Sequence, residues 1–151
     1  MSASLEAGAL RAAIVAEARG WIGTPYRHQA SLKGVGCDCL GLLRGVWREV
    51  VGPEPEEAPP YSPDWAEASG AETLLALAER RLVRVLPGSI RPGDVLLFRW
   101  RENLPAKHCA VAATPGTMVH AHDGASVAEV AIAPWWGRRL AGVFAFPGTD
   151  G

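Results

Sequence analysis

The sequence predicts an α+β fold, in which N-terminal helices pack on an antiparallel sheet of five to six strands. Helical patterns occupy the first half of the chain, and short β-prone runs occupy the second half, an order typical of this class. The length of 151 residues and the 48% hydrophobic content suit one domain with an ordinary core. We therefore expect residues 1–151 to form a single domain.

Three helices are expected from the spacing of apolar residues and from the breakers that follow them. The first covers about residues 5–21 and precedes the breaker at 23–25. The second begins at residue 38 or 39, runs to about residue 51, and is stopped by Gly52-Pro53. The third covers residues 71–82. Each presents an apolar face that a sheet would cover.

The second half of the chain changes pattern. Gly, Pro or Asp residues separate short runs of β-prone residues, which we expect as strands at 95–100, 109–113, 117–121, 127–132 and 143–146. Between the second and third helices, residues 52–63 are acidic and rich in proline. We expect them to form an ordered surface loop, since neither flanking part is large enough to be a domain.

The composition excludes several classes of partner. Fifteen basic residues against sixteen acidic ones give no positive field, so nucleic acid is not an expected partner. No apolar run approaches the roughly 20 residues that span a bilayer, so membrane insertion is not expected. Residues 1–21 are patterned as an amphipathic helix without the features of a secretory signal. We expect the protein to be made in the cytoplasm without a signal peptide.

The stretch GCDCLGLL at residues 36–43 holds the first candidate for chemistry. A cysteine nucleophile needs a lowered pKa, because the thiolate is the attacking species. A helix N-terminus supplies part of that shift, and Cys39 follows Asp38, a good N-cap residue. Gly41 would let another backbone or a substrate approach the first turn. Cys39 is therefore the candidate nucleophile.

A general base has to come from elsewhere in the chain, which has four histidines. His108 opens one predicted strand, and His120 lies near the end of the next. If these strands are neighbours, both imidazoles can lie on one face near the start of the second helix. That arrangement gives a nucleophile, a base and an orienting group in Cys39, His108 and His120.

The other cysteines and the tryptophans are expected to be structural. Three cysteines do not suggest a disulfide framework. Cys109 alternates with His108 and should face the opposite side, into packing. Cys37 lies before the helix, close enough to the nucleophile to form a disulfide or sulfenamide under oxidation. Trp135 and Trp136 are expected in the core or at its rim, and a position bordering a groove is the alternative.

A zinc site is the competing interpretation, with ligands from Cys37, Cys39, His108 and either His120 or His122. Structural zinc sites space their cysteines more widely than C-x-C, and the sequence has no HExxH motif. We therefore expect no metal and no other cofactor.

Five stretches of this chain resemble the NlpC/P60 cysteine peptidases and occur in that family's order. They are GTPYRHQ (23–29), DCLGLL (38–43), RPGDVLLF (91–98), KHCAVA (107–112) and MVHAH (118–122). The resemblance implies a papain-like core, with Cys39 as nucleophile, His108 as base and His120 as orienting residue. It also places Tyr26 beside the site and Asp38 before the nucleophile.

The chain departs from the wider family at two places. Leu40 replaces the common serine of DCSG, and Arg27-His28-Gln29 replaces the usual aromatic-glycine pair after the tyrosine. Both changes touch residues that shape substrate recognition in the family. The resemblance implies that Tyr26, Asp38 and Leu40 bind substrate or the oxyanion. His28 and His122 are expected beside the site, and His122 is the alternative to His120 in the third role.

The resemblance also implies a substrate and a setting. The substrate would be a peptidoglycan stem peptide, cut between D-glutamate and the following diamino acid. GTPYRHQ and the C-terminal WWGRRLAGVFAFP (135–147) resemble peptidases encoded near phage-type tail genes. This similarity implies incorporation in a phage-like tail particle, with hub or tip proteins as partners and the cell wall as target. Two alternatives stay open: a catalytically idle tail or wall-binding component, and an acyltransferase on the same fold.

Overall fold

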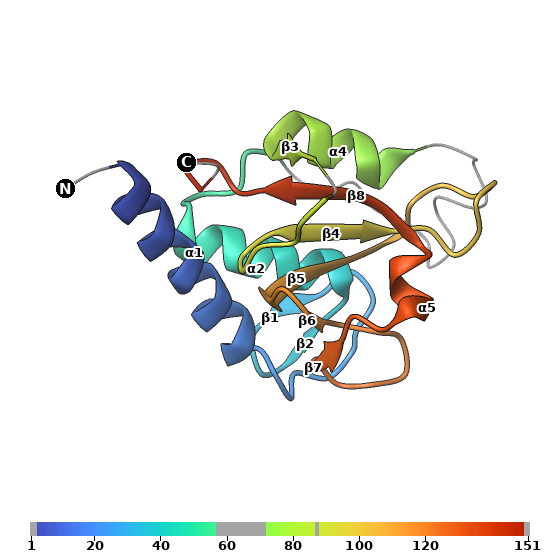
Figure 1. The fold of residues 1–151 in the computed structure, drawn as a ribbon. Coiled ribbons are helices and arrows are strands. Elements are labelled where there is room, and N and C mark those ends of the chain that lie inside the picture. The colour runs from blue at the N-terminus through green and yellow to red at the C-terminus, as the bar shows by residue number, and fades with distance from the viewer. Residues whose placement is uncertain (1–2, 57–71, 87, 150–151) are drawn as a thin grey trace.

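The computed structural model describes residues 3–56, 72–86 and 88–149. Helices and strands follow each other as the sequence predicts, helices first (Figure 1). In chain order the elements are α1 (Ala3–Gly20), β1 (Ser31–Leu32), β2 (Gly36–Cys37), α2 (Cys39–Val50), α4 (Thr73–Arg81), β3 (Val83–Val85), β4 (Val95–Phe98), β5 (His108–Thr114), β6 (Thr117–His120), β7 (Ala128–Ala131), α5 (Pro134–Gly137) and β8 (Leu140–Ala145).

The main sheet has six strands in the order β3-β8-β4-β5-β6-β7, and all neighbouring pairs are antiparallel. The strands that carry the two histidines, β5 and β6, are neighbours, as expected. In the pairing of β4 with β5, Leu97 lies opposite Cys109 and Phe98 lies opposite His108. The predicted α+β class and the antiparallel sheet are confirmed.

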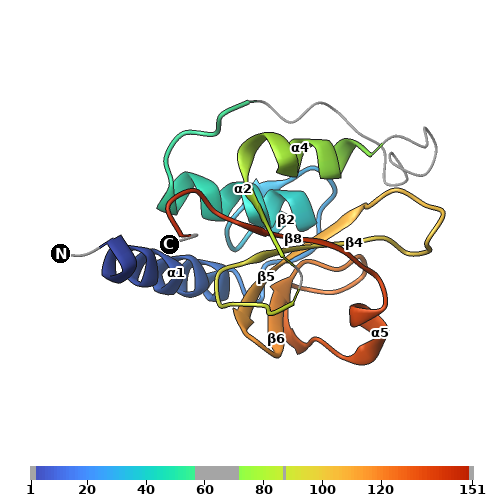
Figure 2. The ribbon, with the colours of Figure 1, turned by 45° about the horizontal axis from the view of Figure 1, so that its top comes forward.

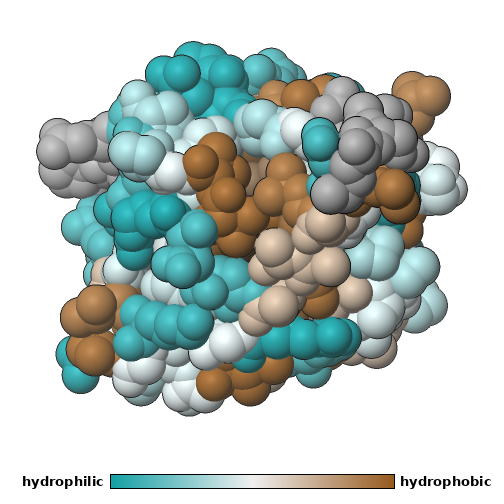
Figure 3. Space-filling view, turned by 90° about the vertical axis from the view of Figure 1, so that its left-hand side faces the viewer, coloured by the Kyte–Doolittle hydropathy of each residue, from teal (hydrophilic) through white to brown (hydrophobic). Residues whose placement is uncertain are grey.

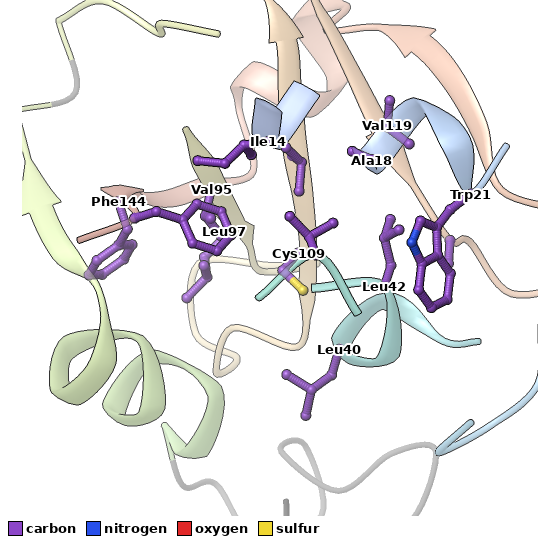
Figure 4. Close-up of a cluster of buried hydrophobic side chains, with 14 of the residues drawn as sticks. Ile14, Ala18, Trp21, Leu40, Leu42, Val95, Leu97, Cys109, Val119 and Phe144 are labelled. Atoms are coloured by element: carbon purple, nitrogen blue, oxygen red, sulfur yellow. The ribbon is translucent and has the colours of Figure 1, made fainter. Parts of the chain in front are cut away.

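The two faces of the sheet carry different apolar clusters. One face packs against α1, α2 and α4, and its buried side chains include Ile14, Leu42, Leu97, Cys109 and Phe144 (Figure 4). The other face carries Leu96, Phe98, Ala110, Ala112, Met118 and Val143, with Trp136 of α5 packed against them. Figure 2 shows α2 and α4 on one side of the sheet and α5 toward the other. Alternation along β5 therefore puts Cys109 and His108 on opposite faces.

Helices α1 and α2 approach each other closely because α2 has a glycine, Gly45, where they meet. The ring of Trp21 covers Gly45, and a Cβ at that position would collide with the indole. Farther along α1, the buried Arg11 forms an ion pair with Asp94 at 2.8 Å, next to the start of β4. Arg11 also donates to the carbonyl oxygens of Pro92 and Thr149. These contacts fix α1 on the sheet that carries the histidines.

Element boundaries differ from the prediction by a few residues, and some elements were missed. The strand expected at 95–100 ends at Phe98, and that expected at 143–146 already begins at Leu140. The short strand β3 and the one-turn helix α5 were not predicted, nor was the β1–β2 pair. All are shorter than five residues, too short for a periodic pattern to stand out.

Part of the acidic loop at 52–63 lies outside the described residues, as does residue 71 of the third predicted helix. Ion pairs anchor the described part of this acidic loop. Glu54 accepts from Arg44 and Arg48 of α2, and Glu56 accepts from Arg80 and Arg81 of α4. Residues 52–56 therefore connect the two helices.

The surface on the side of α1 is mixed in character. Figure 3 shows apolar patches between larger hydrophilic areas on this face. Exposed apolar side chains include Leu5 at the start of α1, Val51 after α2, and Leu86. Among the described helices, none combines the length and the apolar character needed to cross a bilayer.

Candidate active site

Cys39 is the first residue of α2, and its position follows from the cap before it. The Asp38 carboxylate accepts the Gly41 N–H at 2.7 Å through Oδ1, and the first intrahelical bond runs from the Leu42 N–H to the Asp38 carbonyl. The N–H groups of Cys39 and Leu40 find no acceptor among the described residues. Two donors at the positive end of the helix dipole are thus left for a negative charge near Cys39.

Gly41 sets how closely the first turn of α2 approaches the preceding loop. A Cβ at this position would collide with the carbonyl oxygen of Ala30. The Gly41 carbonyl also accepts a hydrogen bond from the Ser31 hydroxyl at 2.6 Å. The close approach expected from the small residue is therefore made by the chain's own backbone, and it fixes the N-terminus of α2.

The thiol of Cys39 interacts with two side chains of strand β5, those of Cys109 and His108. The pKa of Cys39 is held well below its ordinary value by hydrogen bonding with Cys109 and by hydrogen bonding and charge from His108, although burial opposes the shift. Its sulfur lies 3.8 Å from the carbonyl oxygen of Lys107, the residue before β5. Cys39 is half-buried. A cysteine in this setting ionises more readily than a free thiol.

His108 and His120 form a direct pair. His108 Nε2 lies 2.9 Å from His120 Nδ1, and both side chains are buried. Burial, followed by the neighbouring His108 and His122, lowers the pKa of His120 to about 3. His120 is therefore neutral at physiological pH and accepts the Nε2–H of His108 through Nδ1. This bond leaves Nδ1 of His108 for the Cys39 thiol.

Aromatic rings enclose this pair. The Trp136 ring stacks on His108 at 5.4 Å between centroids and meets His120 edge to face at 5.3 Å. Trp100 stacks on the His108 ring at 5.6 Å. These indoles exclude water from the pair, in keeping with the desolvation that lowers the pKa of His120. The sequence placed Trp136 in the core or at its rim, but could not identify the side chains that it touches.

His122 lies next to the pair without joining its hydrogen bond. It is exposed, its ring stacks parallel to His120 at 5.6 Å, and it meets His108 edge to face at the same distance. Burial and the charge of His108 lower the pKa of His122. The hydrogen-bond partner of His108 is therefore His120 and not His122.

Tyr26 and Asp38 lie on the helix side of the site. Burial raises the pKa of Tyr26, with further contributions from the charges of Cys39 and Asp38, so its phenol stays protonated. Asp38 is 2% exposed. Its Oδ2 accepts the Gln29 N–H at 2.7 Å and lies 3.8 Å from Nδ1 of His28. Direct contact between Asp38 and a substrate amino group therefore requires His28 and the turn at Gln29 to move.

Leu40, which is expected to bind substrate or the oxyanion, has a buried side chain. Its side chain is 4% exposed and belongs to the buried apolar cluster that includes Leu42 and Cys109 (Figure 4). The second residue of α2 thus turns its side chain inward, and the expected role of Leu40 in binding substrate or the oxyanion stays a prediction. Its backbone N–H remains at the helix terminus, where it can serve an oxyanion.

The two remaining cysteines are buried, as expected, but they differ in their contacts. Cys37 lies in the core, and burial followed by the charge of Asp38 raises its pKa to about 12. Cys109 faces away from His108, as expected, yet that side is where α2 begins. Its sulfur lies 3.2 Å from the Cys39 carbonyl oxygen. Sequence alternation predicted the face of Cys109 correctly but could not show which helix covers it.

The carboxylate of Glu72 holds the loop before β5, and no pattern in the sequence indicated this role. Glu72 accepts the Ala106 N–H at 2.7 Å through Oε1 and bonds Arg99 at 3.0 Å through Oε2. Arg99 in turn donates to the Leu104 carbonyl. The loop that leads into His108 is therefore tied to the start of α4.

The zinc interpretation requires several ligands to converge on one point. Within residues 3–56, 72–86 and 88–149, no three His, Cys, Asp or Glu side chains are arranged to hold a metal ion. His108 and His120 point ring nitrogens at each other, whereas zinc ligands point them at a common centre.

Known proteins resemble this chain both in sequence and in fold. Among curated proteins, the chain is 28% identical over 134 residues to gamma-DL-glutamyl hydrolase of Bacillus subtilis (strain 168), which covers 88% of this chain. The chain spans 29% of that relative's length. The sequence model of the NlpC/P60 family matches residues 23–144.

Solved structures agree on the fold. The NlpC/p60 domain of the peptidoglycan hydrolase SagA superposes with a TM-score of 0.62 at 24% identity, covering 90% of this chain and 98% of that one. An NlpC/P60 family protein from Bacillus cereus gives a TM-score of 0.66 at 19% identity, covering 90% of this chain and 40% of that one. The family match supports the predicted class of enzyme, a hydrolase of the cysteine peptidase type. With 122 consecutive positions from 23 to 144 matched by its model, the chain belongs to the NlpC/P60 family.

Proposed function

We propose that this protein is a cysteine hydrolase that cuts an amide bond in peptidoglycan stem peptides, between D-glutamate and the following diamino acid. The observation that carries this proposal is the placement of Cys39 at the N-terminus of α2, with the buried His108–His120 pair beside it. The similarity to a gamma-DL-glutamyl hydrolase supports a glutamyl amide as the kind of bond that is cut. The peptidoglycan hydrolase domain of the same fold supports the choice of polymer.

The reaction begins with proton transfer from Cys39 to His108. Nδ1 of His108 takes the proton from the thiol, and the resulting imidazolium is stabilised through Nε2 by neutral His120. The thiolate attacks the carbonyl carbon of the substrate amide. The N–H groups of Cys39 and Leu40 donate hydrogen bonds to the developing oxyanion, and the protonated phenol of Tyr26 is a further candidate donor.

Two further steps complete the turnover. When the tetrahedral intermediate collapses, the C–N bond breaks, and His108 gives its proton to the leaving amine nitrogen. This leaves a thioester between the acyl group and Cys39. Water, deprotonated by His108, then attacks the thioester, releases a carboxylate and returns the thiol. No cofactor is needed for these steps.

Hydrolysis is tested by mass spectrometry of defined stem peptides, with diaminopimelate or lysine at position three, and of purified sacculi. The wild type and Cys39→Ala are compared, with Cys37→Ala as the matched control because Cys37 is a buried thiol two residues away. We expect one fragment from wild type and Cys37→Ala and none from Cys39→Ala. Intact stems with all three folded proteins would refute hydrolysis and favour the idle component. Transfer of the acyl group to an added amine would favour the acyltransferase.

We also propose a preference for stems with a free N-terminus, and the same assay tests it. A free amino group is attracted by the negative charge of Asp38, which lies behind His28. We expect N-acetylated stems to be cut more slowly than free ones. Equal rates on the acetylated and the free stems would show that Asp38 does not select the substrate and serves only as the N-cap of α2.

The setting that we propose is a phage-like tail particle, into which the protein is incorporated after synthesis in the cytoplasm. The support is the similarity of residues 23–29 and 135–147 to peptidases encoded near phage-type tail genes. Hub or tip proteins would be its partners, and it would open the cell wall locally. Purified particles analysed by mass spectrometry should contain the chain together with tail-tip proteins. Its absence from particles that are otherwise complete would refute this setting.

A further inference from the structure

The thiol of Cys109 touches the residue that bears the candidate nucleophile. Cys109 Sγ lies 3.2 Å from the Cys39 carbonyl oxygen, in hydrogen-bond range for sulfur, and the side chain is 1% exposed. Figure 4 shows Cys109 in the layer between the strands and α2, near Leu40 and Leu42. The first turn of α2 is therefore joined to β5 through this thiol.

A thiol carries one hydrogen, which rotates about the Cβ–S bond. It therefore donates to one nearby acceptor at a time. While Cys39 is neutral, the carbonyl oxygen is the acceptor that Cys109 uses. Once Cys39 ionises, the same residue presents a sulfur anion. Hydrogen bonds to ionised acceptors are roughly twice as strong as neutral ones, so the anion becomes the preferred acceptor.

The electrostatics of the two thiols agree with this division of roles. Hydrogen bonding with Cys109 is the largest influence that lowers the pKa of Cys39, ahead of His108. The same interaction, together with burial, raises the pKa of Cys109 well above its ordinary value. Cys109 therefore keeps its proton when Cys39 loses one, as a donor must.

We propose that Cys109 is a positioning residue for the Cys39 sulfur: its S–H holds the first turn of α2 against β5 and turns to the sulfur when Cys39 ionises. Cys109 itself does not touch the substrate. The inference rests on the proposed function, because it assigns Cys39 the role of nucleophile. It adds a second donor, which comes from the face of β5 opposite to that of His108.

Alkylation kinetics test this role without a substrate. The rate of Cys39 carbamidomethylation by iodoacetamide is measured from pH 4 to 10, with peptide mapping to assign the modified residue. Cys109→Ala and Cys109→Val remove the donor, and Val keeps the volume in case Ala impairs folding. Cys109→Ser keeps a donor. Cys37→Ala is the control, because it removes another buried core thiol close to Cys39.

We expect Cys109→Ala and Cys109→Val to raise the midpoint of Cys39 alkylation by about 1 pH unit, the order expected from losing one charge-assisted donor. Below the wild-type midpoint their rates fall roughly tenfold, and at high pH they match the wild type. Cys109→Ser and Cys37→Ala should follow the wild-type profile. Profiles of Cys109→Ala and Cys109→Val that coincide with wild type would overturn the inference, as would an equal shift in Cys37→Ala.

The outcome separates this inference from the proposed function. If wild-type Cys39 titrates low and stems are cut, but the Cys109 variants are unchanged, only the positioning role fails. If wild-type Cys39 titrates near 8.5, the ordinary value of a free thiol, and no stem is cut, both the proposed function and this inference fail.

Discussion

His108 Nε2 and His120 Nδ1 lie 2.9 Å apart, buried beneath the ring of Trp136. This bond decides which ring nitrogen of His108 faces the nucleophile, because Nε2 is occupied and Nδ1 is left for Cys39. It also requires that the proton of neutral His120 sits on Nε2. The third member of the site is thus a histidine that acts as a hydrogen-bond acceptor.

The first prediction separates His120 from His122. Replacing His120 by Ala removes the acceptor that orients His108, and we expect kcat/KM to fall by roughly 10²- to 10⁴-fold, the range of a general-base contribution. His120→Asn keeps an acceptor and should lose less. His122→Ala is the matched control, since the exposed His122 stacks on the pair without bonding His108. A larger loss in His122→Ala than in His120→Ala would reverse the assignment.

The second prediction concerns the pH dependence of stability. The folded pKa of His120 is about 3, whereas an unfolded histidine titrates near 6.5. Between these values the unfolded chain binds more protons than the folded one, so the free energy of unfolding falls as pH is lowered from about 6.5 toward 3.

Urea denaturation at pH 7 and pH 5 measures this effect above the range in which the carboxyl groups titrate. We expect the wild type to lose stability at pH 5 and His120→Asn to lose less. An equal loss in both proteins would mean that His120 is not held neutral by the fold.

The third prediction concerns the first turn of α2. In Gly41→Ala the new Cβ collides with the Ala30 carbonyl, and we expect a loss of roughly 1–3 kcal/mol in stability, with Cys39 displaced. Gly8→Ala is the control on α1, where nothing lies within 4 Å of the new Cβ. That change should stabilise by about 0.5–1 kcal/mol. Thermal unfolding and kcat/KM check both variants, and a fully active, stable Gly41→Ala would contradict the close approach.

The fourth prediction concerns the indole that covers the histidine pair. Trp136→Ala admits water to His120, so the pKa of His120 should rise from about 3 toward 6.5. We expect kcat/KM to fall by about 10- to 100-fold as His108 loses its fixed orientation. Trp135→Ala is the control, because Trp135 is 43% exposed and packs on Trp100, Trp136 and Arg139. NMR titration of the His120 ring reports the pKa, and an unchanged value would contradict the shielding role.

The sequence predicted the parts of the site that depend on local pattern. Asp38 before an apolar helical run placed Cys39 at a helix N-terminus, and the structure puts it there. Two neighbouring β-prone runs brought His108 and His120 onto one face, as β5 and β6 do. The catalytic roles of these residues stay predictions until activity is measured.

Other features depend on contacts between distant segments, which no local pattern contains. The side chain of Leu40 is buried in the apolar cluster that also holds Ile14 of α1 and Cys109 of β5. Cys109 reaches Cys39 across 70 positions of sequence, and Glu72 reaches Ala106 across 34. Trp136 lies in a helix of four residues, too short for its packing partners to be inferred from spacing.

Trapping of the acyl-enzyme tests the central claim most directly. The wild type is mixed with a defined γ-D-glutamyl stem peptide, quenched in acid after milliseconds to seconds, and its intact mass and peptide map are recorded. The account predicts a transient adduct with the mass of the acyl half of the stem, mapped to Cys39, present in Cys37→Ala and absent in Cys39→Ala. Cleavage without any adduct, or an adduct on Cys37 or Cys109, would contradict it.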